Sequence, residues 1–302
     1  MNTTFLGIDM GGTGSRFALV DRDGTLIVRG VAGGGTGNLF SDAARSEFHE
    51  AIAEIATACR PHAITATVAG ITGLGAPVEP TARGILADVL DLPVDAIGLF
   101  NDAELAYHAA FSPGEGHLIA AGTGTIGLHV APDGTSTRVG GRGPLIDDAG
   151  SGSWLALRAL EAVFRDIDRN GRPTETAILA RHLFAAIDGY DWDTVRGYVY
   201  GNGRGKLGEL AVAVSAAESE GDPIAADLMK RAGDELALLA NALRARCGRL
   251  PIHVTGRVPS LSPVLRDTFR QALGDVQIRF EAIDVALAAA QLAVKNFGGR
   301  AR

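Results

Sequence analysis

Two short clusters of glycine with threonine or serine offer a way to bind phosphate. They lie at Gly11–Ser15 and Gly122–Thr125. Glycine has no Cβ, so backbone N–H groups can approach an anion closely, and consecutive N–H groups form an anion-binding nest. The side-chain hydroxyls add further donors. The candidate phosphate-binding residues are Gly11, Gly12, Thr13, Ser15, Gly122, Thr123, Gly124 and Thr125. Taken alone, either cluster is more typical of an ordinary tight hairpin than of a phosphate site.

Three acidic residues lie at expected strand ends or turns. Asp9 ends an apolar run just before the first cluster, where a carboxylate could hold Mg²⁺ directly or through water. Asp102 follows Asn101 at an expected strand-to-helix junction, and Asp148 precedes a Gly-rich turn and the helix expected from Trp154. Aspartate is also a favoured helix N-cap, so capping stays open as an alternative for Asp102 and Asp148.

Two matches to the dinucleotide-binding pattern GxGxxG fail on their context. Gly122–Gly127 follows an expected strand but continues into Leu128–Val130, which alternates like another strand. Gly203–Gly208 opens an expected helix, but no strand precedes it. The dinucleotide fingerprint requires both a strand before the glycines and a helix after them. A Walker A loop is also absent, because Lys206 is followed by Leu207 and not by serine or threonine.

The first cluster recurs at a fixed distance along the chain. Gly12–Gly14 reappears as Gly122–Gly124, and Asp23–Thr25 reappears as Asp133–Thr135, both 110 residues later. Short matches can arise by chance among 40 glycines, but the flanking segments also agree. Each copy reads as strand, Gly/Thr turn, strand, Asp-Gly turn and strand. We therefore expect two duplicated domains, and the strands followed by helices predict an α/β fold.

Composition excludes several classes of protein. The chain has 302 residues, 46% of them hydrophobic, and a formal net charge of −7, which disfavours binding to nucleic acid. Its two cysteines, Cys59 and Cys247, are too few for a disulfide framework or a cysteine-held cluster. Polar residues interrupt every candidate membrane span, and no signal-like segment is present. We expect a cytoplasmic protein with no membrane partner.

The motifs, taken in order, resemble one known family. They are similar to the phosphate, catalytic, sugar-side and adenosine motifs of the BadF/BadG-type family, which includes N-acetylglucosamine kinase and bacterial glucosamine kinase. This family lies within the superfamily that joins sugar kinases, heat-shock chaperone ATPases and actin. The segments that carry the resemblance are Gly7–Thr13, Asn101–Ala103, Ala121–Thr125, Gly140–Leu155 and Val254–Gly256.

The resemblance implies two duplicated ribonuclease H-like (actin-like ATPase) domains with a cleft between them. We expect the first domain at residues 1–112 plus a C-terminal helix at 289–302, and the larger second domain at residues 113–288. It implies an ATP-dependent kinase that uses Mg²⁺ to phosphorylate the 6-hydroxyl of an amino sugar, either N-acetylglucosamine or glucosamine. We also expect a homodimer.

Roles for single residues follow from the same resemblance. Asp102 is the expected catalytic base and a sugar contact, and Asp9 is the expected Mg²⁺ residue, directly or through water. Asn38 and Asp148 match sugar-binding positions, and Gly256 belongs to the adenosine motif. Departures from the family pattern occur at Arg142, Ala149 and Arg257, and they leave the identity of the sugar open.

The same scaffold supports three other functions. An ATPase that activates a radical enzyme needs a cluster held by cysteines, for which Cys59 and Cys247 are too few. A sugar-sensing regulator would carry a DNA-binding domain ahead of the first phosphate motif, which here begins within ten residues of Met1. An actin-like or chaperone-like ATPase that needs no sugar is the third alternative, and sugar-stimulated release of ADP would distinguish it.

Overall fold

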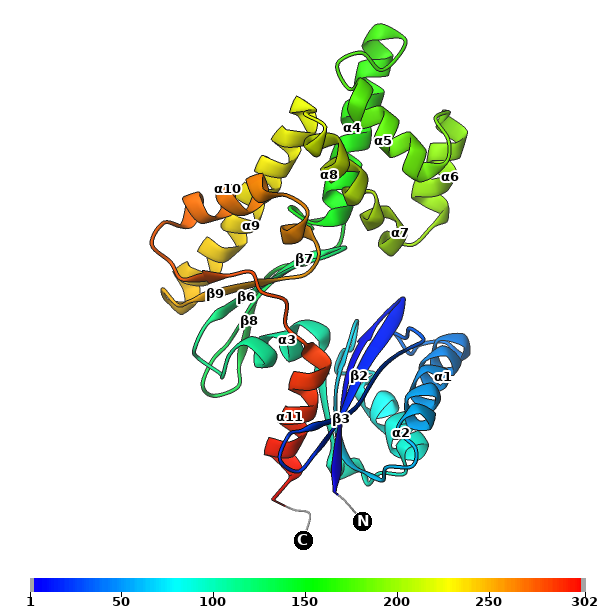
Figure 1. The fold of residues 1–302 in the computed structure, drawn as a ribbon, viewed down its shortest axis with the longest axis vertical. Helices are drawn as coiled ribbons and strands as arrows, with labels where there is room; N and C mark the ends of the chain where they lie inside the picture. Colours follow the sequence, from blue (N-terminus) through cyan, green and yellow to red (C-terminus); the bar gives the residue numbers. More distant parts are fainter. Residues whose placement is uncertain (1–2, 300–302) are drawn as a thin grey trace. The chain divides into compact units, whose positions relative to one another are not determined.

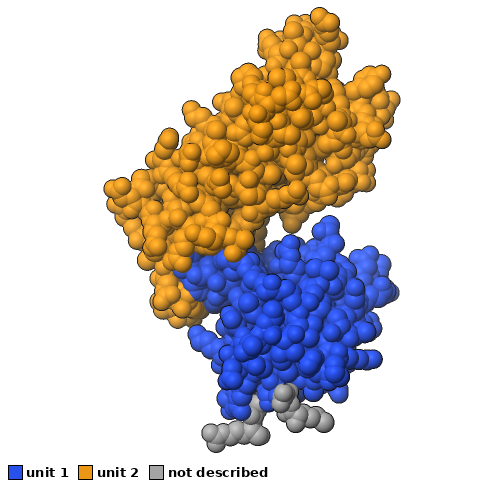
Figure 2. All heavy atoms as spheres, viewed as in Figure 1, with its two compact units in different colours: residues 1–111, 283–302 blue, residues 112–282 orange. Residues whose placement is uncertain are grey.

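The computed structural model describes residues 3–299, which form two compact units. Unit 1 comprises residues 1–111 and 283–302, and unit 2 comprises residues 112–282 (Figure 2). Residues 283–288, which the sequence placed in the second domain, cluster with unit 1, because the helix that begins at Val285 packs along its whole length on the sheet of unit 1. No helix among residues 3–299 is long and apolar enough to cross a bilayer.

Unit 1 is built on a five-stranded sheet in the order β3-β2-β1-β4-β5. The first three strands are antiparallel neighbours, and β4 and β5 run parallel to β1. Their bounds are Thr4–Gly11 for β1, Gly14–Asp21 for β2, Leu26–Ala32 for β3, Ile64–Ile71 for β4 and Ile97–Asn101 for β5. The carboxyl ends of β1, β4 and β5 therefore meet at one edge of the sheet.

Helices cover both faces of this sheet (Figure 1). Helices α1 (Asp42–Ala58) and α2 (Glu79–Leu90) pack on one face, against Leu6, Ile8 and Leu19. Helices α3 (Asp102–Ala110) and α11 (Val285–Phe297) pack on the other, against Phe5, Ala18 and Val20. Successive side chains of a strand point to opposite faces and both faces of this sheet are covered, so the strands have continuous apolar segments, such as Phe17–Val20 in β2.

Unit 2 repeats this topology. Its sheet has the order β10-β9-β6-β7-β8, in which β6, β7 and β8 are antiparallel and β9 and β10 run parallel to β6. The bounds are His117–Ala121 for β6, Thr125–Val130 for β7, Ser136–Gly140 for β8, Ile252–Thr255 for β9 and Ile278–Arg279 for β10. Strand for strand, this is the order of unit 1, so the duplication predicted from the 110-residue offset is confirmed.

The helices of unit 2 form the larger part of its core. The buried cluster joins the sheet to α4, α5, α8, α9 and α10 through Leu155, Leu183, Val214, Leu236 and Phe269. The helices span Gly152–Asn170 (α4), Ala177–Ile187 (α5), Trp192–Gly201 (α6), Arg204–Glu209 (α7), Ala211–Ser219 (α8), Pro223–Cys247 (α9) and Pro263–Leu273 (α10). Short 3₁₀ turns lie at Val94–Ala96 in unit 1 and Val258–Ser260 in unit 2.

Candidate functional site

The first Gly/Thr cluster is the turn of the β1–β2 hairpin. Gly11 and Gly14 are the last paired residues, so Gly12 and Thr13 form the exposed tip. The segment after β3 supports the hairpin from behind, because the Gly35 amide donates to the Gly11 carbonyl over 3.1 Å. A Cβ on Gly34 would lie 2.5 Å from the Gly12 carbonyl oxygen, so only glycine allows this approach.

The sequence predicts that Ser15 donates to phosphate, but the structure buries its side chain. It is buried, and its hydroxyl donates to the Gly33 carbonyl over 2.8 Å. Its only hydroxyl proton is therefore used to hold the segment after β3 against the hairpin. The exposed donors at this turn are the backbone of Gly12 and Thr13 and the Thr13 hydroxyl.

Asp9, at the carboxyl end of β1, lies among charged groups. Arg16 pairs with it across the β1–β2 ladder, with 3.9 Å between the guanidinium and carboxylate. Burial raises the pKa of the Asp9 carboxyl, and the Arg16 guanidinium lowers it. The nearby carboxylates of Asp102 and Asp284 raise it further, so the pKa of Asp9 lies above its usual value. A divalent cation would relieve this repulsion, and carboxylate oxygens are the ligands that Mg²⁺ prefers. The donor set therefore fits Mg²⁺, with Asp9 as the residue that would hold it.

Asp102 is the first residue of α3, but it does not cap the helix. Asn101 is the N-cap, and its side-chain oxygen accepts from the Glu104 amide over 2.9 Å. The Asp102 carboxylate accepts from the Ala103 amide at Oδ1 over 2.9 Å and from the Thr72 hydroxyl at Oδ2 over 2.8 Å. The capping alternative thus falls to Asn101, and the Asp102 side chain is held half-buried at the carboxyl end of β5.

Sequence reasoning missed Thr72, which follows β4 directly. Its amide donates to the Met10 carbonyl over 3.0 Å, and its carbonyl accepts from the Gly37 amide over 2.8 Å. Thr72 therefore connects β1, the segment after β3 and Asp102. A lone threonine after a strand belongs to no motif, so the only available signal was its position at the end of a buried parallel strand.

Asn38 lies close to this group. A Cβ on Gly73, the residue after Thr72, would be 3.2 Å from the amide oxygen and nitrogen of Asn38. Gly73 has a φ of 77°, in the left-handed region that favours glycine. The Asn38 side chain is exposed. Unit 1 thus brings together Asp9, the hairpin tip, Asn38 and Asp102, four of the elements expected from the sequence.

The second cluster is the β6–β7 hairpin of unit 2, and the start of α4 supports it. The Gly152 amide donates to the Gly122 carbonyl over 2.8 Å, and the Ser153 amide donates to the Thr123 carbonyl over 3.1 Å. A Cβ on Gly152 would be 2.9 Å from the Gly208 carbonyl oxygen of α7. The Gly-rich stretch before α4 therefore allows three segments of unit 2 to meet at this hairpin.

Asp148 lies against the same hairpin. Ser151 is the N-cap of α4, so Asp148 has no capping role. Asp148 is 4% exposed, and its Oδ1 is 3.5 Å from the Thr125 amide nitrogen. Its Oδ2 and the Thr125 hydroxyl are buried and have no hydrogen-bond partner among residues 3–299. The structure thus places Asp148 beside the second phosphate candidate and not on an open surface.

Gly256 closes the same edge of the unit 2 sheet. It follows β9 with a φ of 98°, and a Cβ there would be 2.3 Å from the Ala121 carbonyl oxygen. Ala121 is the residue before the second hairpin. The turn after β9 can lie this close to the hairpin because Gly256 has no side chain. Gly256, Asp148 and the Gly122–Thr125 hairpin form a second candidate site, within unit 2.

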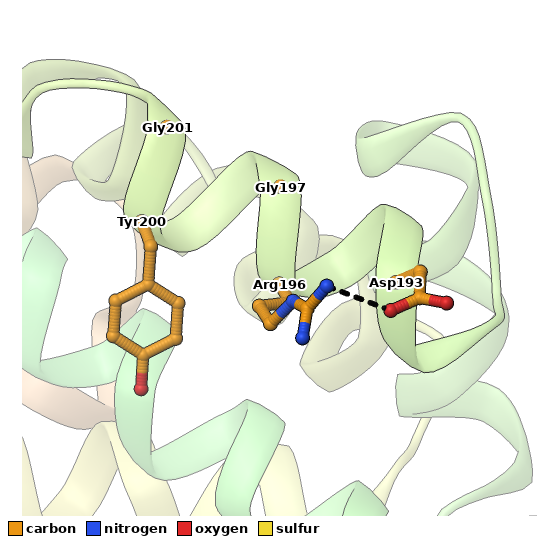
Figure 3. Close-up of a pocket in the computed structure, with 5 residues that line it drawn as sticks. All are labelled: Asp193, Arg196, Gly197, Tyr200 and Gly201. Carbon is orange, nitrogen blue, oxygen red and sulfur yellow. Dashed lines mark ion pairs between the residues drawn. The ribbon is translucent and has the colours of Figure 1, made fainter.

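A separate surface pocket contains none of these residues. It has a volume of about 550 Å³ and lies on α6, where it is lined by Asp193, Arg196, Gly197, Tyr200 and Gly201 (Figure 3). Asp193 and Arg196 form an ion pair of 3.0 Å, one turn apart on the helix. Both side chains of this pair are largely exposed, and the pocket is separate from the two hairpins.

The two sheets have the same strand order, and each has a Gly/Thr hairpin at the carboxyl end of its first strand. This is a duplicated ribonuclease H-like fold of the actin-like ATPase class. The sequence profile of the BadF/BadG/BcrA/BcrD ATPase family matches residues 6–292, and the chain belongs to that family.

Relatives and solved structures agree with this placement. An N-acetylmuramic acid/N-acetylglucosamine kinase from Clostridium acetobutylicum is 28% identical over 179 residues, which are 57% of this chain and 58% of that protein. The match thus spans less than two thirds of the relative's length. A Chromobacterium violaceum structure, provisionally named an N-acetylglucosamine kinase, has a TM-score of 0.74 at 24% identity, covering 97% of this chain and 99% of its own. A ROK family glucokinase from Streptomyces griseus, solved with glucose and AMPPNP, has a TM-score of 0.59 at 18% identity, with the same coverage. Both structures support the fold.

Proposed function

We propose that this protein is an ATP-dependent kinase that phosphorylates the 6-hydroxyl of an amino sugar, N-acetylglucosamine or glucosamine. The observation that carries the proposal is the carboxylate of Asp102, which Thr72 and the Ala103 amide orient at the edge of the sheet that also presents Asp9 and the first hairpin. A base close to a phosphate-binding turn and a metal-binding carboxylate is what phosphoryl transfer to a hydroxyl requires.

Asp102 has the capacity to act as the base. Each of its oxygens accepts one hydrogen bond from the protein, which leaves a second lone pair on each for a substrate hydroxyl. In the transfer, the sugar oxygen forms a bond to the γ-phosphorus as the bond from that phosphorus to the β–γ bridging oxygen breaks. The hydroxyl proton passes to Asp102, and ADP leaves.

The other residues bind and orient. The phosphate-binding donors that we propose in unit 1 are the backbone amides of Gly11–Thr13 with the Thr13 hydroxyl, and those in unit 2 are the backbone amides of Gly122–Thr125. Ser15 would support the first of these turns through Gly33. Mg²⁺, held by Asp9 directly or through water, supplies neutralisation of phosphate charge when bound. Asn38 would contact the sugar beside Asp102, and Gly256 would admit the adenosine to its turn.

Similarity to the kinase from Clostridium acetobutylicum supports this choice over the alternatives. An activator of radical enzymes needs cysteine thiolates to hold its cluster, and burial raises the pKa of the Cys59 thiol to about 11, which disfavours its thiolate. An actin-like ATPase that needs no sugar would share the hairpins and would use Asp102 to orient the attacking water, so sugar-stimulated release of ADP is what distinguishes the two functions.

The experiment is an assay of ADP release with ATP, Mg²⁺ and a panel of sugars. The panel contains glucosamine, N-acetylglucosamine, N-acetylmannosamine, N-acetylmuramate and glucose, and the product is examined for phosphate on the 6-oxygen. We expect one of the first two sugars to give the highest kcat/KM. ADP release that no sugar accelerates would instead identify a sugar-independent ATPase. The homodimer expected from the sequence is tested on the same sample by light scattering.

A further inference from the structure

The segment Gly33–Ser41 connects β3 to α1 and carries Asn38, the proposed sugar contact. Two of its backbone amides attach it to the sheet. One donates to the carbonyl of Gly11 in the first hairpin over 3.1 Å, and the other donates to the carbonyl of Thr72 over 2.8 Å. Because Thr72 also bonds to Asp102, the path of this segment determines where Asn38 lies relative to the proposed base.

Close packing requires glycine in this segment, and glycine makes the segment costly to order. A Cβ on Gly34 would be 2.5 Å from the Gly12 carbonyl oxygen, and one on Gly35 would be 3.0 Å from the Met10 sulfur. With Gly33 the run is three glycines long. Glycine loses more conformational freedom on ordering than any other residue. A fixed path along the hairpin therefore needs contacts from outside the segment.

Side chains hold the first glycine of this run from two sides. Ser15 of β2 donates its hydroxyl proton to the Gly33 carbonyl over 2.8 Å. Glu54 of α1 accepts from the Gly33 amide at Oε2 over 2.7 Å. A hydrogen bond from an N–H group to a carboxylate is stronger than one between neutral groups. Ser15 is buried but Glu54 is exposed, so the Glu54 side chain can be replaced without opening a cavity in the core.

The far end of the segment is attached to the same helix. Arg45, in the first turn of α1, donates from its guanidinium to the Leu39 carbonyl over 2.9 Å. Ser41 caps α1 by accepting from the Ala44 amide over 3.2 Å. The segment therefore lies between α1 and the first hairpin, and Glu54 attaches its glycine-rich end to the helix.

We propose that Glu54 is a positioning residue for the sugar: its carboxylate fixes the Gly33 amide, and through the glycine run it holds Asn38 where Asn38 contacts the substrate. This inference rests on the proposed kinase function. The role needs an acceptor oxygen at the right distance and does not need a negative charge. Glutamine keeps such an oxygen at the same distance, whereas aspartate keeps the charge on a side chain one methylene shorter.

The test measures the Kd of N-acetylglucosamine and of glucosamine by calorimetry, in the presence of ADP and Mg²⁺. Glu54→Ala should raise the Kd of the sugar that binds roughly 3- to 10-fold, the range for loss of one hydrogen bond, and Glu54→Asp should resemble it. Glu54→Gln should stay close to the wild-type value. Glu47→Ala removes the same charge from an exposed position of α1 and should leave the Kd unaltered.

Hydrogen exchange followed by mass spectrometry gives a second measurement that needs no substrate. In Glu54→Ala the amides of residues 33–37 should exchange faster than in the wild type, because the glycine run has lost one attachment. The rest of α1 should keep its protection, and the melting temperature should match that of Glu47→Ala. A merely structural role for Glu54 would instead lower the melting temperature and leave the sugar Kd intact.

The outcomes separate this inference from the proposed function. If a sugar still stimulates ADP release but Glu54→Ala binds it as the wild type does, the inference is wrong and the kinase function stands. Equal Kd values in Glu54→Gln and Glu54→Ala would also overturn it, because the acceptor oxygen would not matter. Should Glu54→Ala fail to fold, wild-type binding by Glu54→Asp overturns the inference. If no sugar binds or stimulates ADP release in the wild type, the proposed function fails, and this inference fails with it.

Discussion

Thr72 donates its hydroxyl proton to Oδ2 of Asp102 over 2.8 Å. The two residues follow neighbouring parallel strands, β4 and β5, at their carboxyl ends. Asn101 caps α3, so the Asp102 side chain is not the cap of the helix that begins with it, and it accepts from the Ala103 amide at Oδ1 while Oδ2 faces Thr72. Phosphoryl transfer depends mainly on positioning and charge neutralisation, and this pair fixes the position of the base.

Replacement of Asp102 by asparagine tests the base directly. Asparagine keeps the size of the side chain but cannot accept the hydroxyl proton, so we expect kcat to fall by roughly 10²- to 10⁴-fold. The dissociation constant for ADP should change little, because Asp102 is not a phosphate ligand. Steady-state kinetics and calorimetry measure the two quantities. Asp95→Asn, at an exposed position of unit 1, is the matched control, and near-normal turnover in Asp102→Asn would rule out the assignment.

Thr72 acts on the reaction through Asp102, so the variants Thr72→Val and Thr72→Ser should differ in kcat. Thr72→Val removes the hydroxyl while keeping the shape, and we expect kcat to fall roughly 10-fold with the sugar KM changing less. Thr72→Ser keeps the donor and should recover most of the lost activity. Both variants should have similar melting temperatures. A purely structural role for Thr72 would instead lower the stability of Thr72→Val and leave its kcat intact.

Much of this arrangement follows from local sequence, and the rest depends on tertiary contacts. The hairpins were predictable because glycine and threonine determine a tight turn and its donors within a few residues. The parallel strand ends that carry Asp9 and Asp102 were predictable from the order of apolar segments. The bond from Thr72 to Asp102 spans 30 residues, and that from Thr125 to Asp148 spans 23. No spacing rule predicts such contacts, because they depend on how the strands are ordered in the sheet.

The same limit explains Ser15 and the boundary of unit 1. Ser15 carries a suitable donor for phosphate, but the segment after β3 provides a carbonyl that uses its proton. The C-terminal helix looks like an ordinary Ala-rich helix, and its assignment to unit 1 from Ile283 onward depends on its docking on β1. The position at which a helix docks depends on which face of a sheet has space for it. The sequence of the helix alone does not show this.

The docking of α11 on β1 depends on a single glycine. A Cβ on Gly7 would be 2.1 Å from the Ala286 carbonyl oxygen and 2.2 Å from the Ala290 amide nitrogen. These backbone atoms can move only with the helix, so Gly7→Ala should destabilise unit 1 by about 1–3 kcal/mol or more. Gly84→Ala, in α2 with nothing within 4 Å of the added Cβ, should instead stabilise by about 0.5–1 kcal/mol. Chemical denaturation measures both, and equal effects would contradict the close approach.

Two buried histidines predict that unit 2 is sensitive to acid. His117 and His253 lie on neighbouring strands, and His117 Nδ1 and His253 Nε2 are buried without partners among residues 3–299. Burial lowers the pKa of both imidazoles below 6.5. At His117 the Gly248 carbonyl raises the pKa, and His129 and Arg244 lower it further. At His253 Glu281 raises the pKa, and Arg279 lowers it further.

The sign of the pH dependence follows from these lowered pKa values. Below about pH 6.5 the unfolded chain binds protons that the folded histidines do not, so the stability of unit 2 should be complete above this pH and fall as the pH decreases toward the folded pKa values. The slope can reach about 1.4 kcal/mol per pH unit for each histidine. Denaturation from pH 8 to pH 5 measures it. His117→Gln, which keeps an N–H donor for the Gly248 carbonyl, should reduce the slope, whereas His49→Gln at an exposed position of α1 should not. A wild-type stability that stays constant from pH 7 to pH 5 would show that the buried imidazoles accept protons without cost.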